Sequence, residues 1–70
     1  PDTREQLMGQ IKSLVTESGL GSDDVKNLTV SALLAKLALQ GGETATKANA
    51  LQGIASKLGI DDLMALWLAK

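Results

Sequence analysis

The sequence contains no cysteine and no histidine, and its only aromatic residue is Trp67. Without cysteine the chain forms no disulfide and has no thiol nucleophile, and without either residue type it lacks the usual ligands of a structural zinc ion. The absence of histidine removes the side chain that most often acts as general acid or base near neutral pH. No recognisable motif pairs a serine or threonine hydroxyl with another base. We therefore expect a protein that is not an enzyme and that uses no metal or other cofactor.

Long apolar runs and an excess of one charge are also missing. No run approaches the roughly 20 apolar residues that a membrane-spanning helix needs, and 7 basic against 8 acidic residues leave a net charge of −1. Helices that bind DNA or a membrane surface usually carry surplus lysine and arginine, so we expect neither nucleic acid nor a membrane as the partner. The polar start of the chain has no signal-peptide pattern, which favours a cytoplasmic location over a membrane-active or secreted helical peptide.

The chain does have enough apolar residues, 44% of 70, to form one small core. β-Branched residues are few and scattered, and no stretch alternates apolar and polar side chains over the length of a strand. The sequence therefore predicts a single all-α domain over residues 1–70, a compact bundle of four or five short helices.

The first helix is predicted over residues 3–18. Its apolar side chains recur at the three- and four-residue spacing of one helix face. They are Leu7, Ile11, Leu14 and Val15. Gly19 follows as a natural stop, because glycine readily adopts the left-handed conformation that ends a helix. A second, short helix is predicted over residues 23–28, where two aspartates lie in the first turn and interact favourably with the helix dipole.

A third helix is predicted over residues 30–40, with Thr29 as its N-cap. Its inward stripe consists of Val30, Leu33, Leu34 and Leu37. The opposite side is also apolar, because it carries Ala32, Ala35 and Leu39. Either this helix is the central one of the bundle, surrounded by the others, or part of it faces a partner.

The last two helices are predicted over residues 47–58 and 62–70. The inward stripe of the first is Leu51, Ile54, Ala55 and Leu58. Gly53 lowers the stability of that helix, which suggests a place of close helix packing. The inward stripe of the final helix is Leu63, Leu66 and Trp67. Met64 and Leu68 then face outward.

Residues 52–67 resemble a helix-turn-helix, the DNA-binding unit in which a tight turn joins two helices. The small residue, the turn glycine and the apolar anchor would be Ala55, Gly59 and Ala65. The second helix of such a unit must supply donors for bases and cations for phosphates. Here it opens with Asp61 and Asp62 and is otherwise apolar until Lys70, so its chemistry does not fit DNA.

A second segment, Leu28-Thr29-Val30-Ser31-Ala32-Leu33 followed by Leu37, Gly41 and residues 47–51, loosely resembles the SAP module, a helix-loop-helix DNA-binding motif that begins Leu-Thr-Val. The resemblance covers under half of the chain and implies lysine and arginine along both helices. Residues 30–58 carry only Lys36, Lys47 and Lys57, and no aromatic residue lies among them to stack on bases. On these two resemblances, a small nucleic-acid-binding domain with a SAP-like or helix-turn-helix-like unit is the alternative function.

Asp23-Asp24 and Asp61-Asp62 are paired carboxylates at predicted helix starts. Adjacent side chains on a helix point about 100° apart, so neither pair forms an acid–base dyad. The spacing of a calcium-binding loop is also missing. We interpret both pairs as residues that favour a helix N-terminus.

The surplus of apolar positions predicts a non-catalytic protein–protein interaction module: a docking, adaptor, regulatory or oligomerisation domain that buries an apolar helical surface. Tryptophan and methionine are enriched at binding surfaces, and a short terminal helix is readily exposed on one side. The predicted contact residues are Leu39, Met64, Trp67 and Leu68. We expect the partner to be another protein or a second copy of this chain.

Overall fold

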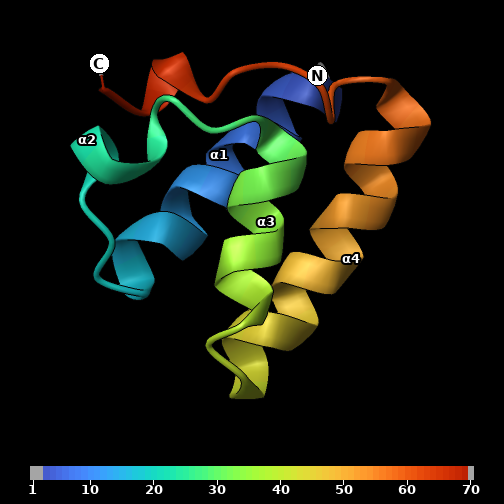
Figure 1. Ribbon diagram of the computed structural model, residues 1–70. Helices are drawn as coiled ribbons and strands as arrows, with labels where there is room; N and C mark the ends of the chain where they lie inside the picture. The colour runs from blue at the N-terminus through green and yellow to red at the C-terminus, as the bar shows by residue number, and fades with distance from the viewer. Residues whose placement is uncertain (1–2, 70) are drawn as a thin grey trace.

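The structure, a computed structural model, describes residues 3–69, which fold as an all-α bundle (Figure 1). Its helices are α1 (Thr3–Glu17), α2 (Ser22–Val25), α3 (Val30–Ala38) and α4 (Gly42–Leu58), followed by the 3₁₀-helix η1 (Leu66–Ala69). α3 and α4 form an antiparallel hairpin, α1 packs against α4, and η1 packs against α2. The predicted fold class, a small bundle of four or five helices, is confirmed.

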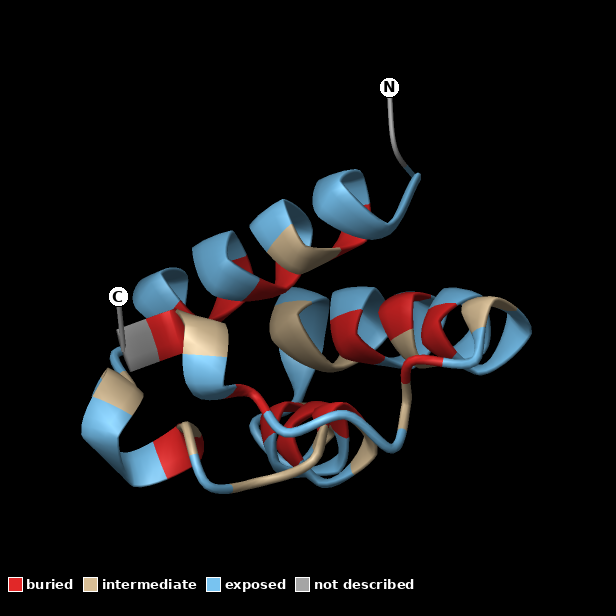
Figure 2. Ribbon diagram, turned by 90° about the horizontal axis from the view of Figure 1, so that it is seen from above, coloured by how far each residue is buried: buried red, intermediate tan, exposed pale blue. Residues whose placement is uncertain are grey.

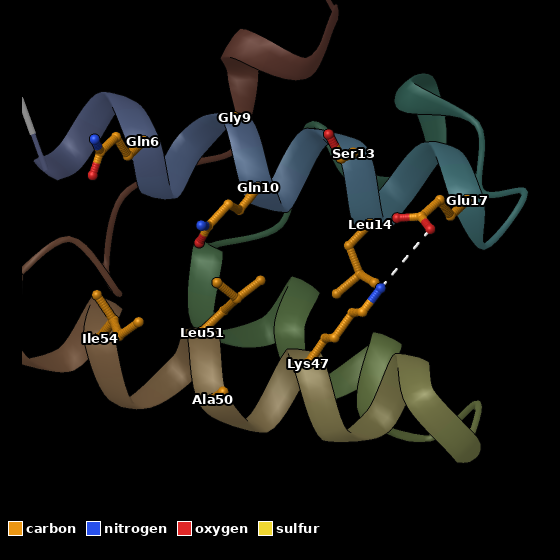
Figure 3. Close-up of a pocket in the computed structure, with 10 residues that line it drawn as sticks. All are labelled: Gln6, Gly9, Gln10, Ser13, Leu14, Glu17, Lys47, Ala50, Leu51 and Ile54. Atoms are coloured by element: carbon orange, nitrogen blue, oxygen red, sulfur yellow. Dashed lines mark ion pairs between the residues drawn. The ribbon is translucent and has the colours of Figure 1, made fainter. Parts of the chain in front are cut away.

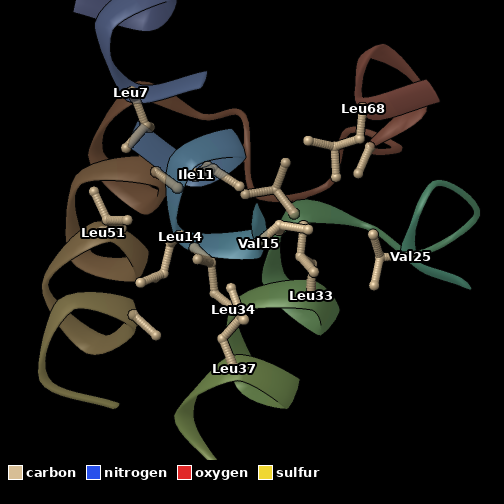
Figure 4. Close-up of a cluster of buried hydrophobic side chains, with 14 of the residues drawn as sticks. Leu7, Ile11, Leu14, Val15, Val25, Leu33, Leu34, Leu37, Leu51 and Leu68 are labelled. Carbon is tan, nitrogen blue, oxygen red and sulfur yellow. The ribbon is translucent and has the colours of Figure 1, made fainter. Parts of the chain in front are cut away.

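Within the described residues, the buried core consists of apolar side chains alone, and they come from every helix (Figures 2 and 4). The predicted stripes of the first and third helices lie wholly inside it. Burying a leucine or isoleucine side chain completely stabilises the fold by about 1.5–3 kcal/mol relative to leaving it in water. Local periodicity therefore identified the side chains that hold α1 and α3 in place.

Two helix boundaries follow the predicted end signals. Gly19, just after α1, has a φ of +78°, and its N–H donates a hydrogen bond to the carbonyl oxygen of Thr16. At the start of α3, the Thr29 hydroxyl accepts a hydrogen bond of 3.1 Å from the N–H of Ala32. The expected break between the second and third helices at Thr29 is thus confirmed.

The outer face of α3 is open to solvent. Ala32 and Ala35 are exposed, and the Leu39 side chain is 87% exposed at the C-cap. α3 packs mainly on α4 and on one side only. Of the two alternatives for this helix, complete enclosure by its neighbours is wrong.

α4 differs from its prediction in three respects. It begins at Gly42 rather than at residue 47, because Gly41, with a φ of +75°, turns the chain tightly and lets a new helix start at once. Ile54, expected inside, is 40% exposed. Gly53 marks no close packing: a Cβ atom placed there would meet no other atom within 4 Å.

The C-terminal segment (residues 60–69) departs furthest from its prediction. Its first half is irregular rather than helical and lies across the N-terminus of α3, and only η1 is helical (Figure 1). The N–H groups of Val30 and Ser31 donate hydrogen bonds to the carbonyl oxygens of Leu63 and Asp61, at 2.8 and 2.9 Å. These N–H groups have no partner within their own helix, so the segment supplies the missing acceptors. Lys70 of the predicted helix lies outside the described residues.

The buried side of the C-terminal segment is also not the predicted one. Its buried side chains are Ile60, Ala65 and Leu68. Leu63 and Leu66, expected in the core, are about half exposed instead. The irregular backbone breaks the 3.6-residue period on which the prediction relied, so Leu63 and Leu66 are exposed and Leu68 is buried.

Candidate functional site

The four predicted contact residues lie in different surroundings. Leu39 and Met64 are exposed, as expected. Trp67 is half-buried and packs against the core, and its indole N–H is buried without an acceptor in the described part of the chain. Leu68 is only 5% exposed and belongs to the core. The prediction that Leu68 faces outward is wrong, because the segment that carries it is not a continuous helix.

Leu39 and Met64 also do not belong to one surface. Leu39 follows the C-terminal end of α3, whereas Met64 forms an isolated antiparallel bridge with Thr29 at the other end. Nine helical residues separate the two ends, a rise of about 13 Å at 1.5 Å per residue. A surface that includes Met64 must therefore be built from its neighbours in the C-terminal segment.

Three exposed apolar side chains of this segment, named here the C-terminal patch, are the candidates: Leu63, Met64 and Leu66. Their side chains are 51%, 42% and 56% exposed. The sequence pattern identified Met64 and missed the two leucines, because it placed them on the inner face of a helix that does not form. No local signal marks them as exposed, since their orientation depends on contacts of the segment with α3.

The backbone of the C-terminal segment explains why the patch points outward. In addition to the two bonds to the first turn of α3, the N–H of Ala65 donates a hydrogen bond of 2.9 Å to the carbonyl oxygen of Leu28. Three main-chain bonds thus fix the segment on both sides of Met64. Since Ala65 and Leu68 fill the space beneath it, the side chains of the patch remain in solvent.

A second surface is a groove of about 970 Å³ between α1 and α4, named here the α1–α4 groove (Figure 3). Its lining includes Leu14 and Leu51, both buried, and the small residues Gly9 and Ala50. At one end, the Lys47 Nζ lies 4.0 Å from the Glu17 Oε1. The sequence analysis did not identify this groove, because its walls come from two helices that are far apart along the chain.

The helix-turn-helix resemblance does not extend to the structure. Ala55 and Ala65 are buried, and Gly59 adopts the left-handed conformation of a tight turn. The second helix of the unit is missing, however, because residues 61–65 form a turn and an irregular stretch across α3. A groove-binding helix is therefore not available in this part of the chain.

The SAP-like stretch does form a helix, a loop and a second helix, α3 and α4. Its three lysines are exposed. Lys47 lies beside Glu17, and Lys57 follows it ten positions later in α4, about 15 Å along the helix axis. This distribution lacks the concentrated positive charge with which proteins bind phosphates.

Asp23 and Asp24 lie in the first turn of α2, as predicted, whereas Asp61 and Asp62 lie in a turn, so the interpretation of the second pair as a helix start is wrong. The Asp23 carboxylate lies 3.3 Å from the Lys26 Nζ, and the main-chain carbonyl of Asp61 accepts the bond from Ser31. Within residues 3–69, no three aspartates or glutamates come together as a possible metal site. None of the helices in that range combines the length and the apolarity that crossing a membrane requires.

In comparisons with known proteins, no protein-family model, curated protein or solved structure matched this chain. The functional proposal therefore rests on the chemistry of the two surfaces, the C-terminal patch and the α1–α4 groove.

Proposed function

We propose that this chain is a non-catalytic interaction domain that binds another protein through the C-terminal patch. One observation carries the proposal. Three of the five large apolar side chains that are exposed in residues 3–69 lie within four consecutive residues of the sequence. Single exposed apolar residues are normal on soluble proteins, whereas apolar residues grouped on one surface often mark a contact with a partner.

The chemistry of the patch suits a contact with protein. Leucine and methionine offer no charge, and the flexible methionine side chain adapts to irregular apolar surfaces. Completing the burial of three half-exposed side chains yields on the order of 3 kcal/mol before the costs of association. The patch is therefore the centre of a larger contact, since a standard interface buries about 800 Å² on each partner.

The patch is also held ready for binding. The main-chain bond between Leu63 and Val30 of α3 is 2.8 Å long, and that between Ala65 and Leu28, two residues before α3, is 2.9 Å long. A segment that is already ordered loses little conformational entropy when a partner binds, which leaves more of the apolar contact energy for affinity. The partner we propose presents an uncharged apolar groove or face to this segment.

The test compares lysine substitutions of exposed apolar residues at two places. Met64→Lys with Leu66→Lys places two charges in the patch, and Leu39→Lys places a charge on an exposed leucine at the other end of α3. A photo-crosslinking residue at position 63 then reports which protein lies against the patch in extracts of cells that make this chain. Circular dichroism establishes that each variant is folded before its contacts are compared.

We expect one specific crosslinked protein with the wild-type chain and with Leu39→Lys, and its loss with the double patch variant. The complex should persist as salt rises, because apolar contacts strengthen slightly in salt, whereas contacts with nucleic acid phosphates weaken steeply. Equal crosslinking by the patch variant, or a product that disappears in moderate salt, would overturn the proposal.

A further inference from the structure

We propose that two copies of this chain associate through the α1–α4 groove, with a twofold axis running along the groove. This surface shares no residue with the C-terminal patch, so the inference does not rest on the proposed function. We place a second copy in the groove because its two walls carry opposite charges, which that rotation brings together.

The two walls of the groove are antiparallel helices (Figure 3). Gly9 on α1 lies opposite Ala50 on α4, and further along the groove the Lys47 Nζ reaches to within 4.0 Å of the Glu17 Oε1. A rotation of 180° about an axis along the groove leaves the position of each residue along that axis unchanged. It places α1 of one copy over α4 of the other. Glu17 of each copy then lies near Lys47 of the other copy, which gives two pairs of opposite charge in one symmetric contact.

Both charges remain available for a partner. Within one chain the Lys47 Nζ and the Glu17 Oε1 are 4.0 Å apart, at the outer limit of an ion pair, and the two side chains are 53% and 61% exposed. An exposed pair at this distance stabilises a single chain little. In the dimer each of these groups would be flanked by an opposite charge from its own chain and by another from the second copy.

Gly9 is compatible with the same arrangement. A Cβ atom at Gly9 would meet no other atom within 4 Å, so the fold of one chain gives no steric reason for glycine there. A helix is less stable with glycine than with alanine at the same position, because glycine loses more backbone freedom on folding. With the small Ala50 on the other wall, Gly9 lets the backbone of a facing helix approach closely. A second copy provides that facing helix.

The apolar side chains of the groove fit the same arrangement. Leu14 and Leu51 lie between the two helices, and Ile54 stands 40% exposed on the α4 side. In the dimer, α1 and α4 of each copy form a four-helix arrangement in which every helix lies antiparallel to its neighbours. Ile54 of each copy then loses its exposure to water against α1 of the other.

The decisive test exchanges the two charges. Glu17→Lys leaves two lysines at this end of the groove, and Lys47→Glu leaves two glutamates, so each variant alone brings like charges together in a dimer. A mixture of the two variants restores both opposite pairs across the axis. Sedimentation equilibrium at low salt should show the wild type dimerising, each variant associating at least about tenfold more weakly, and the equimolar mixture recovering association.

A second test uses two glycines with the same environment within one chain. Gly9 and Gly53 are both exposed and both have open space where a Cβ would lie, but only Gly9 lines the groove. Gly9→Gln and Gly53→Gln add the same polar side chain and should both fold. We expect Gly9→Gln to weaken the dimer and Gly53→Gln to leave its dissociation constant unchanged.

Three results would overturn the inference. The first is a wild-type chain that stays monomeric up to about 1 mM, the weak end of specific association. The second is a mixture of the charge variants that associates no better than either variant alone. The third is a dimer that Gly9→Gln leaves intact and that Leu66→Lys abolishes, which would assign self-association to the C-terminal patch.

Discussion

The backbone N–H of Val30 donates a hydrogen bond of 2.8 Å to the carbonyl oxygen of Leu63. Val30 is the first residue of α3 and Leu63 belongs to the C-terminal segment, so this bond joins the start of a core helix to the last part of the described chain. Together with the Thr29 hydroxyl and the carbonyl of Asp61, Leu63 satisfies three N–H groups that a helix start leaves without partners. The stability of α3 and the position of the C-terminal patch therefore depend on each other.

Thr29→Ala should lower the free energy of unfolding by about 1 kcal/mol, within the range of 0.5–2 kcal/mol measured for lost N-caps. The substitution removes the acceptor of the Ala32 N–H, and the helix end is left with one unpaired donor. Urea denaturation followed by circular dichroism gives the value. Thr29→Ser is the control, because it keeps the hydroxyl and should cost markedly less. Equal losses for the two variants would show that the cap hydrogen bond does not stabilise α3.

Leu68→Ala should destabilise the chain by about 2–5 kcal/mol, because it removes a buried side chain and leaves a cavity. Leu66→Ala, two residues earlier, should change stability by no more than about 0.5 kcal/mol, because Leu66 is exposed. Comparing the two variants distinguishes the observed C-terminal segment from a continuous helix, because a continuous helix would bury Leu66 and expose Leu68. Chemical denaturation of the two variants measures both values, and the reverse order would contradict the structure.

The difference between α1 and the C-terminal segment shows how far the sequence predicts this fold. In α1, local periodicity alone places Leu7 and Ile11 in the core, because a helix of 15 residues presents one face for several turns. In the C-terminal segment, main-chain bonds to α3 replace helix bonds. Such bonds connect residues that are distant in sequence and leave no periodic pattern. A prediction from helix periodicity therefore puts Leu66 in the core, although it is exposed.

The candidate surfaces were predictable to different degrees for the same reason. Met64 was identified because it is apolar and lay off every predicted inward stripe. The α1–α4 groove was not, because Gly9 and Ala50 come from separate helices that only the fold brings together. Their common level becomes visible only when α1 is docked antiparallel to α4 (Figure 3).

Gly59→Ala and Gly53→Ala should change stability in opposite directions. Gly59 ends α4 with a φ of +72°, and an alanine in this left-handed conformation costs roughly 1–2 kcal/mol. Gly53 lies within α4 and has open space around its Cβ position, so alanine should raise the free energy of unfolding by about 0.5–1 kcal/mol. Thermal unfolding of the two variants, which differ from the wild type by one methyl group each, tests both signs. A stabilised Gly59→Ala variant would contradict the observed helix end.

Trp67→Phe should change the free energy of unfolding by less than about 1 kcal/mol, although truncating a large aromatic side chain to alanine typically costs about 3–5 kcal/mol. The indole N–H of Trp67 is buried and has no acceptor in the described part of the chain. A buried donor without a partner destabilises a fold by about 1–3 kcal/mol, and phenylalanine removes this donor while it keeps an aromatic ring against the core. The gain from removing the donor should therefore offset most of the lost contact area. Because the substitution also removes the only fluorescent indole, unfolding must be followed by circular dichroism. A loss above about 2 kcal/mol would mean that the N–H is hydrogen-bonded in solution, with a buried water molecule as the partner.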